Sequence, residues 1–152
     1  GNAFPASGGR VVEGLGLLPI VTEPATPRSV GELLLDSTLG IGQLTGFENH
    51  AGQTRFVEKL QPLGIVKHGI GNHNSEKCDG AVTENIIATY MHGPALVRNP
   101  KLADYFLARK LGELAPIASD KDAVFSALHS SCIKRVNKSA ESVDDGFVVI
   151  IA

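Results

Sequence analysis

This sequence of 152 residues has no tryptophan, a single methionine and only two cysteines, and aromatic residues make up 5% of it. Two cysteines cannot supply the set of bridges that holds a small secreted domain together. The first residues also lack the basic start and the apolar stretch of a secretory signal. We therefore expect free thiols and a cytoplasmic protein. No apolar run approaches the ~20 residues of a membrane-spanning helix, so no membrane span is predicted.

An excess of charge of one sign is also missing. The chain has 14 basic and 16 acidic side chains and a formal net charge of -2. Nucleic-acid binding depends on a basic surface, so this balance argues against a nucleic-acid partner. The contents of 43% hydrophobic and 20% charged residues are those of an ordinary globular protein, and the length fits one domain.

Glycine and proline are abundant, with 17 and 8 residues, and they divide the first part of the chain into short apolar runs. Such runs predict buried strands. A turn is predicted at 69–72, because two glycines and an asparagine tolerate positive φ. The predicted strands are 15–22, 30–35, 43–47, 63–67 and 86–91, with a proline-containing loop at 24–27 between the first two.

The pattern becomes helical after His92. Asn99 is a suitable N-cap, Pro100 suits the first helical position and Gly112 suits a helix end, which predicts a helix over 99–111. A second helix is predicted over 122–135. Residues 144–152 are either an edge strand or a frayed tail. We expect an α/β fold class.

His92 is the first candidate for catalysis. It follows a β-branched apolar run, and Gly93-Pro94 then ends the strand. Residues at strand ends line ligand crevices in α/β sheets, where an imidazole can act as general base and then as general acid. The alternative is a histidine that only hydrogen-bonds within the turn.

Other polar residues have weaker local patterns. Residues 46–54 (GFENHAGQT) suit a site or an interface loop, but we favour hydrogen bonds of Glu48 and His50 to each other and to nearby backbone. Arg28 could bind a carboxylate with its planar guanidinium, although its immediate sequence indicates a solvated surface residue. No metal site is predicted at His68, His73 and Cys78, because the spacing is irregular and a fourth ligand is missing. Cys78 and Cys132 are interpreted as ordinary thiols, since neither lies in a strand–turn–helix elbow.

Four runs in this order resemble one family: 13–18 (EGLGLL), 44–50 (LTGFENH), 69–72 (GIGN) and 88–94 (ATYMHGP). They look like the class I glutamine amidotransferases of the cobyric acid synthase type. Within that family they are most similar to the amidotransferase subunits of lipid II isoglutaminyl synthases, because of the GFENH run. The resemblance covers roughly residues 11–112.

The resemblance implies roles for two residues. His92 matches the catalytic histidine, and Arg28 matches an arginine that binds the α-carboxylate of the glutamine substrate. Many members carry a glutamate two residues after the histidine, where this chain has Pro94. A Cys–His dyad, or a third group from elsewhere, is therefore implied. The family's nucleophilic cysteine lies in a glycine-rich elbow that this sequence lacks, so we expect the 152 residues alone to be inactive.

The resemblance also implies an architecture and a reaction. The fold should be the later portion of a three-layer amidotransferase domain with a mixed sheet, formed by residues 1–112 and followed by a divergent tail, 113–152. The activity should be glutamine hydrolysis that supplies ammonia to a Mur-ligase-like synthase subunit. That partner would amidate D-glutamate of lipid II and would bind ATP and magnesium, so no cofactor is expected on this chain. The alternatives are a cobyric-acid-type amidotransferase with a corrin substrate and a non-catalytic scaffold.

Overall fold

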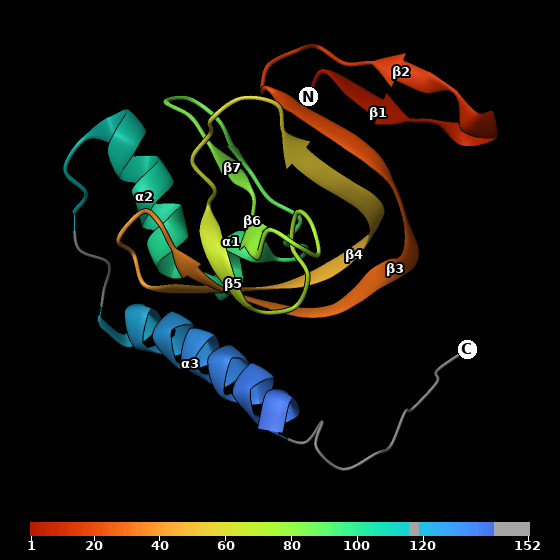
Figure 1. Cartoon of the computed structure of the whole chain (residues 1–152). Coiled ribbons are helices and arrows are strands. Elements are labelled where there is room, and N and C mark those ends of the chain that lie inside the picture. Colours follow the sequence, from red (N-terminus) through yellow and green to blue (C-terminus); the bar gives the residue numbers. More distant parts are fainter. Residues whose placement is uncertain (116–118, 142–152) are drawn as a thin grey trace.

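The computed structural model of the chain describes residues 1–115 and 119–141. Two long strands dominate it, β3 (Ile20–Ser37) and β4 (Gln43–Phe56), which form an antiparallel pair. They curve around the shorter strands and loops of residues 61–92 (Figure 1). Strand β1 (Ala3–Pro5) runs parallel to β3, whereas the other pairings in this sheet are antiparallel. The predicted mixed sheet of an α/β protein is thus confirmed.

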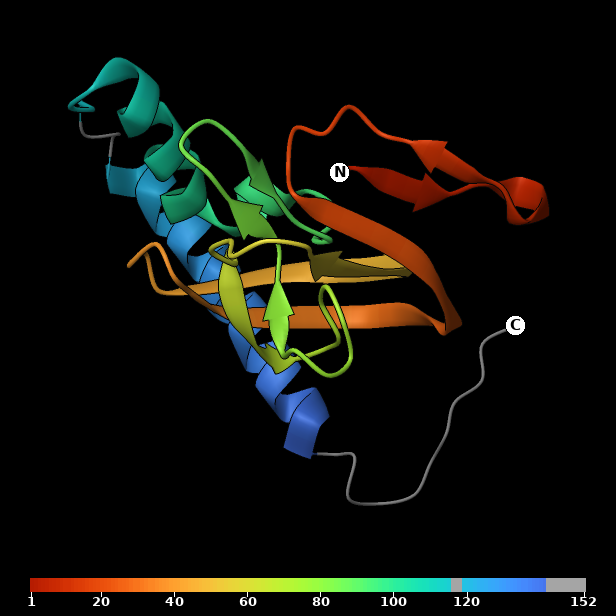
Figure 2. The same ribbon diagram turned by 45° about the horizontal axis from the view of Figure 1, so that its top comes forward.

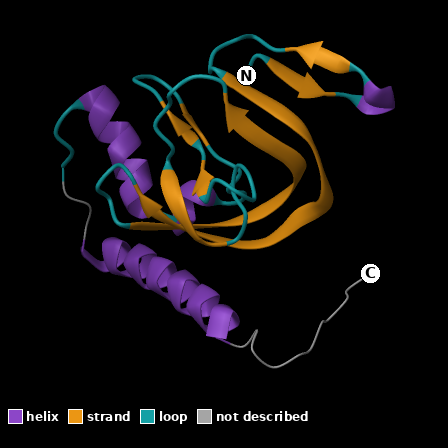
Figure 3. Ribbon diagram, in the orientation of Figure 1, coloured by secondary structure: helices purple, strands orange, loops and turns teal. Residues whose placement is uncertain are grey.

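The main sheet has six strands. Its order is β2–β1–β3–β5–β6, and β4 pairs with β3 beside this path. A second, two-stranded sheet lies inside the curve of the long strands (Figure 3). The short strands are β2 (Val11–Glu13), β5 (Gly64–His68), β6 (Cys78–Asp79), β7 (Ala81–Val82) and β8 (Ile87–Ala88), and a 3-10 turn (Ser7–Gly9) joins β1 to β2.

Strand β3 differs from the prediction at both its start and its middle. The predicted strand over 15–22 was wrong at its start, because β3 begins at Ile20 and the side chains of Leu15 and Leu17 are 88% and 65% exposed. The predicted loop at 24–27 lies within β3. There, residues 25–28 stand opposite the single residue Ala51, and the pairing register shifts. Proline has no N–H to donate to a ladder, which is why pairing is interrupted at this proline-rich segment.

The remaining strand predictions hold to different extents. Strand 43–47 is confirmed and continues to Phe56, and strand 63–67 is confirmed as β5. The turn at 69–72 is confirmed, with φ of 94° at Gly69 and 73° at Gly71. The prediction for 86–91 was too long, because regular pairing is confined to β8 at 87–88.

Helix α2 (Pro100–Leu111) is found where it was predicted, but Asn99 does not cap it through its side chain. The amide is buried and reaches β4 instead. Its Oδ1 accepts a hydrogen bond from Thr45 N at 2.7 Å, and its Nδ2 donates to Thr45 O at 2.8 Å. The short helix α1 (Ala95–Arg98) precedes it. Asn99 therefore joins the start of α2 to the sheet.

Helix α3 (Ser119–Glu141) confirms the predicted second helix and is longer than expected. It packs along β3 and β4 on the outside of their curve (Figure 2). The His129 ring nitrogen Nδ1 donates to Arg98 O at 2.8 Å, which links α3 to α1. No helix in the described ranges is long and apolar enough to span a membrane. The strand or tail considered for 144–152 lies outside the described residues.

The main core lies on the concave side of the β3–β4 pair. Leu33, Leu35 and Leu44 are at most 1% exposed and project from these strands into it. Strands β5 and β7, helix α2 and the connecting segments complete the core with Leu63, Val66, Val82, Met91 and Leu102. This packing brings the segment before His92 directly against β4.

Candidate active site

The site is organised by the middle of β4, where side chains alternate between two environments. Glu48 and His50 face inward and are 2% and 7% exposed. Phe47 and Asn49 face the other side and are exposed. This is the ordinary two-residue alternation of a strand. The GFENH run therefore sends successive residues to opposite sides of β4.

Glu48 binds the turn at 69–71 through both carboxylate oxygens. Oε1 accepts a hydrogen bond from Ile70 N at 2.8 Å, and Oε2 accepts one from Gly71 N at 2.9 Å. A negatively charged acceptor strengthens such bonds. The carboxylate thus satisfies two backbone donors and fastens the glycine turn to β4.

His50 continues this inward row. Its Nδ1 donates to Gly52 O at 2.8 Å, and its Nε2 lies 3.5 Å from Oε2 of Glu48. The ring stacks on Tyr90, with centroids 3.7 Å apart and planes inclined by 17°. His50 thus binds neighbouring backbone as expected. The expected hydrogen bond between Glu48 and His50 is not formed, because His50 Nε2 has no hydrogen-bond partner among the described residues and Glu48 binds the distant turn at 69–71 instead.

Tyr90 is also held through its hydroxyl group. Its oxygen lies 2.8 Å from Thr54 Oγ1, which in turn lies 2.8 Å from Thr22 Oγ1. A hydroxyl group both donates and accepts, so these three groups form a continuous chain. A cavity of about 180 Å³ lies beside this chain, and Thr22, Thr54 and Tyr90 contribute to its lining. Tyr90 is therefore fixed at its ring and at its oxygen.

Asp79 fixes the backbone at Thr89 and Tyr90. It is 0% exposed and accepts hydrogen bonds from Tyr90 N at 3.3 Å and from the Thr89 hydroxyl group. Thr89 Oγ1 itself accepts one from Met91 N at 3.0 Å. Burial raises the pKa of Asp79 above its usual value, and the bonds from Thr89 and Tyr90 oppose that rise. Side chains thus order residues 89–91, where regular strand pairing has ended.

His92 is exposed and is tied to β4 through its backbone. Its N–H donates to Phe47 O at 2.7 Å, in an isolated antiparallel bridge. The preceding Met91 is buried against Gly46, where an added Cβ would lie 2.5 Å from Met91 Cβ. Glycine at position 46 therefore permits the close approach that brings His92 to β4.

Arg28 is placed at the end of the register shift in β3, and it reaches across to β4. Its Nε donates to Asn49 Oδ1 at 2.6 Å, and its Nη2 donates to Asn49 O at 3.0 Å. Both side chains are exposed. The guanidinium is thus held by two bonds to one residue.

The structure brings Arg28 and His92 to the same strand edge. The Phe47 carbonyl accepts from His92, and the Asn49 carbonyl accepts from Arg28. Carbonyl groups two residues apart on a strand point to the same edge and lie about 7 Å apart. The Arg28 side chain and the His92 backbone, distant in sequence, therefore both bind carbonyl groups along this edge of β4.

Sequence reasoning assigned no function to Asn49 and did not single out Asp79 or Tyr90. The alternation of GFENH was a usable signal, because a strand over 43–47 that continued by two or three residues would place Phe47 and Asn49 on one side. Tyr90 contacts His50 and Thr54, which are far from it in the chain, and Asp79 binds Thr89 and Tyr90 across a loop, so sequence spacing gives no comparable signal.

The two cysteines have the surroundings of unreactive thiols. Cys78 is 8% exposed, and burial, together with the nearby Glu76 and Asp79 carboxylates, raises its pKa. Cys132 is 7% exposed on α3. A nucleophilic cysteine needs a lowered pKa and access to substrate. In the described ranges, no group of three or more His, Cys, Asp and Glu side chains is arranged to hold a metal ion.

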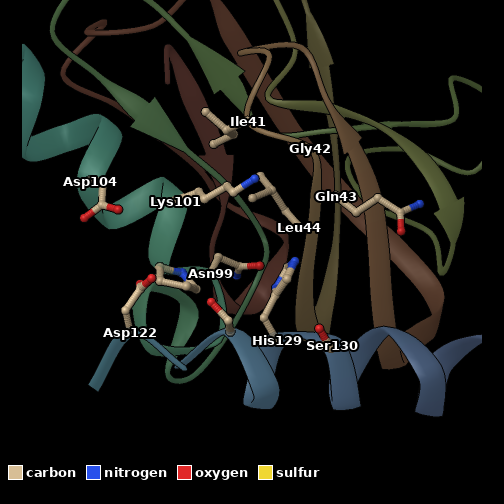
Figure 4. Close-up of a pocket in the computed structure, with 12 residues that line it drawn as sticks. Ile41, Gly42, Gln43, Leu44, Asn99, Lys101, Asp104, Asp122, His129 and Ser130 are labelled. Atoms are coloured by element: carbon tan, nitrogen blue, oxygen red, sulfur yellow. The ribbon is translucent and has the colours of Figure 1, made fainter. Parts of the chain in front are cut away.

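A separate cavity of about 440 Å³ lies between the beginning of α2 and α3 (Figure 4). Lys101, Asp104, Asp122 and His129 contribute polar groups to its lining. Neither Arg28 nor His92 lines it. This cavity is therefore distinct from the edge of β4.

Comparisons with known proteins identify related sequences. The chain is 34% identical over 146 residues to the Staphylococcus aureus lipid II isoglutaminyl synthase (glutamine-hydrolyzing) subunit GatD, covering 93% of this chain and 58% of that protein. It is 34% identical over 104 residues to the Streptococcus pneumoniae GatD, covering 68% and 40%. A probable cobyric acid synthase of Methanosphaera stadtmanae is 40% identical over 90 residues, covering 54% and 18%.

This chain therefore spans about three-fifths or less of the length of these relatives. Residues 4–100 match the CobB/CobQ-like glutamine amidotransferase domain. That range contains β4, Arg28 and the 89–92 segment, which together form the candidate site. The chain belongs to the CobB/CobQ-like glutamine amidotransferase family.

Proposed function

We propose that this chain forms the substrate-binding and proton-transfer part of a glutamine amidotransferase that hydrolyses L-glutamine to glutamate and ammonia. The observation that carries the proposal is that the Arg28 guanidinium and the His92 backbone N–H bind carbonyl groups two residues apart on β4, those of Asn49 and Phe47. Glutamine has a carboxylate at one end and a reactive amide about 5 Å away, separated by four carbon–carbon bonds. An arginine and a histidine held at one strand edge supply a guanidinium for the carboxylate and an imidazole for proton transfer at the amide.

In this proposal Arg28 binds the α-carboxylate of glutamine, because a guanidinium donates parallel bonds to a carboxylate. His92 accepts the proton of a cysteine thiol, whose thiolate attacks the side-chain amide carbon. The imidazolium then gives this proton to the departing ammonia as the tetrahedral intermediate collapses to a thioester. Water hydrolyses the thioester, which releases glutamate and restores the thiol.

The nucleophile in this proposal comes from outside the 152 residues. The raised pKa of Cys78 and the burial of Cys132 support this. Pro94 stands where many members carry the glutamate that orients the histidine, so His92 works in a dyad or with a third group from elsewhere. We accordingly expect no glutamate release from this chain by itself, and turnover abolished by Cys78→Ala would contradict that expectation.

The ammonia acceptor follows from the relatives that carry the name lipid II isoglutaminyl synthase subunit. We propose a cytoplasmic heterodimer with a Mur-ligase-like synthase subunit. That subunit activates the α-carboxylate of D-glutamate in the lipid II stem peptide with ATP and magnesium, and ammonia displaces the activating group. L-glutamine binds to this chain, whereas lipid II binds to the partner.

A cobyric-acid-type enzyme is the second candidate, because cobyric acid synthases are among the relatives. Such an enzyme would hydrolyse glutamine in the same way and deliver ammonia to a corrin carboxylate. The identity of the amidated product, lipid II peptide or corrin, distinguishes the two candidates.

The test uses His92→Ala in the complete amidotransferase with its synthase partner. Glutamine-dependent amidation should be lost, and amidation with added ammonium should largely survive, because acyl activation does not involve this imidazole. Equal loss of both reactions with a lowered melting temperature would make His92 structural. Unchanged glutamine-dependent amidation would show that His92 is not the catalytic base.

A further inference from the structure

Asn49 is the only partner that the structure gives the Arg28 guanidinium within the described residues. It supplies two acceptors, one from its side chain and one from its backbone, at 2.6 and 3.0 Å. Its backbone is fixed, because the regular pairing of β4 with β3 includes the Val30–Asn49 pair. A rigid strand therefore presents both acceptors to a long and otherwise exposed side chain.

The two contacts determine which part of the guanidinium is free. Arginine has five N–H donors arranged in a plane. Asn49 takes the donor on Nε and one donor on Nη2, which together form one edge of that plane. The two Nη1 donors and the second Nη2 donor remain, and one hydrogen from each of these nitrogens can form a parallel pair toward a carboxylate.

We propose that Asn49 is a positioning residue for glutamine binding. It holds the Nε–Nη2 edge of Arg28, so that the Nη1 and Nη2 ends present a preformed fork to the substrate α-carboxylate. This inference rests on the proposed role of Arg28. Holding the side chain in place before substrate binds reduces the rotamer entropy that binding would otherwise cost.

The same arrangement gives a reason for the alternation of the GFENH run. Glu48 and His50 have buried partners, whereas Asn49 lies between them on the exposed side and contacts Arg28. An asparagine supplies a side-chain oxygen without a charge, so the guanidinium keeps its full positive charge for the substrate. An aspartate here would place a competing carboxylate on the arginine.

The experiment measures kcat and KM for glutamine hydrolysis in the complete amidotransferase. The variants are Asn49→Ala, Arg28→Ala and the double variant, with Asn85→Ala as an exposed asparagine control that makes no contact with Arg28. Arg28→Ala should raise KM by tenfold or more. Asn49→Ala should raise KM by about threefold to tenfold, with kcat within twofold and an unchanged melting temperature.

The double variant separates positioning from an independent contact. If Asn49 acts through Arg28, the double variant should have the KM of Arg28→Ala, because residues that share one function are not additive. A wild-type KM in Asn49→Ala, with a raised KM in Arg28→Ala, would overturn the inference and leave the proposed function intact. Multiplied effects in the double variant would also overturn it. An unchanged KM in Arg28→Ala would remove both the inference and the assigned role of Arg28.

Discussion

The two sides of β4 have different tasks, although they are formed by alternating residues of one short run. On the inward side, Gly46, Glu48 and His50 meet Met91, the 69–71 turn and Tyr90. On the outward side, Asn49 is exposed and contacts only Arg28 through its side chain among the described residues. The inward residues support the site, and the outward residue meets a side chain proposed to bind substrate.

This difference teaches that neighbours in one motif need not share a role. Substitutions on the inward side remove buried hydrogen bonds or close packing, so they should lower stability and activity together. A substitution of Asn49 should change substrate binding and leave stability unchanged. Measurements on the two sides therefore test whether support and substrate binding are separated in this way.

The largest loss of stability should come from Glu48→Ala. It leaves the N–H groups of Ile70 and Gly71 without their acceptor. Each buried donor that loses its partner costs roughly 1–3 kcal/mol, so we expect the free energy of unfolding to fall by about 3 kcal/mol. Urea unfolding measures this loss. Glu84→Ala, on an exposed loop, is the control and should change it by less than about 0.5 kcal/mol. An equal loss in both variants would contradict the supporting role of Glu48.

A smaller loss should follow Gly46→Ala. The new methyl group would lie 2.5 Å from Met91 Cβ, so the segment that leads to His92 must shift. Overpacking of this kind typically costs 1–3 kcal/mol, and we expect about 2 kcal/mol together with reduced glutamine hydrolysis. The matched control is Gly31→Ala. Gly31 lies on β3, pairs with Glu48 of β4 and has open space where a Cβ would lie. Thermal melting and the glutaminase rate are measured for both variants. A Gly46→Ala variant with the stability and rate of the control would contradict the close Gly46–Met91 packing as the cause.

The smallest effect should be a change in pH dependence at Asp79. Burial raises the pKa of this carboxyl group in the folded chain above its ordinary value of 3.8. The folded state then holds a proton that the unfolded state has released, so this contribution to stability is complete below the unfolded pKa and is lost as the pH rises through the folded pKa. Asp79→Asn does not titrate. Relative to this variant, wild type should therefore lose stability as the pH rises above about 4.

Urea unfolding of both proteins at several pH values between 4 and 7 measures this difference. The comparison cancels the titration of groups that the two proteins share. A difference that stays constant across this range would show that Asp79 has no raised pKa in the folded chain.

The sequence predicted the parts of the fold that depend on local patterns. Pro100 and Gly112 marked the ends of α2, and the glycines of 69–72 marked a turn. The strand over 15–22 was wrong at its start because the apolar residues Leu15 and Leu17 are exposed rather than paired. The strand predicted over 86–91 was too long, because the Asp79 side chain orders residues 89–91 through hydrogen bonds instead of strand pairing. Side-chain hydrogen bonds outweighed the strand propensity of that segment.

The sequence likewise predicted only some residues of the candidate site. The sequence supplied His92 and Arg28 through the order of four motifs, and both remain predictions until the variants are measured. It also indicated that His50 binds neighbouring backbone, which the structure confirms, whereas the expected hydrogen bond between Glu48 and His50 is not formed. It gave no role to Asn49, because that role depends on where Arg28 lies after the register shift in β3.

The sequence by itself determined the family, the α/β class and the glycine turn at 69–72, because these depend on residue type and order. Only the tertiary structure decided which residues meet. Arg28 and His92 are separated by 63 intervening positions. Arg28 reaches β4 from the end of the register shift in β3, and the Met91–Gly46 contact brings His92 to the same strand. Hydrogen bonds and packing act between neighbours in space, and the folded chain alone determines those neighbours.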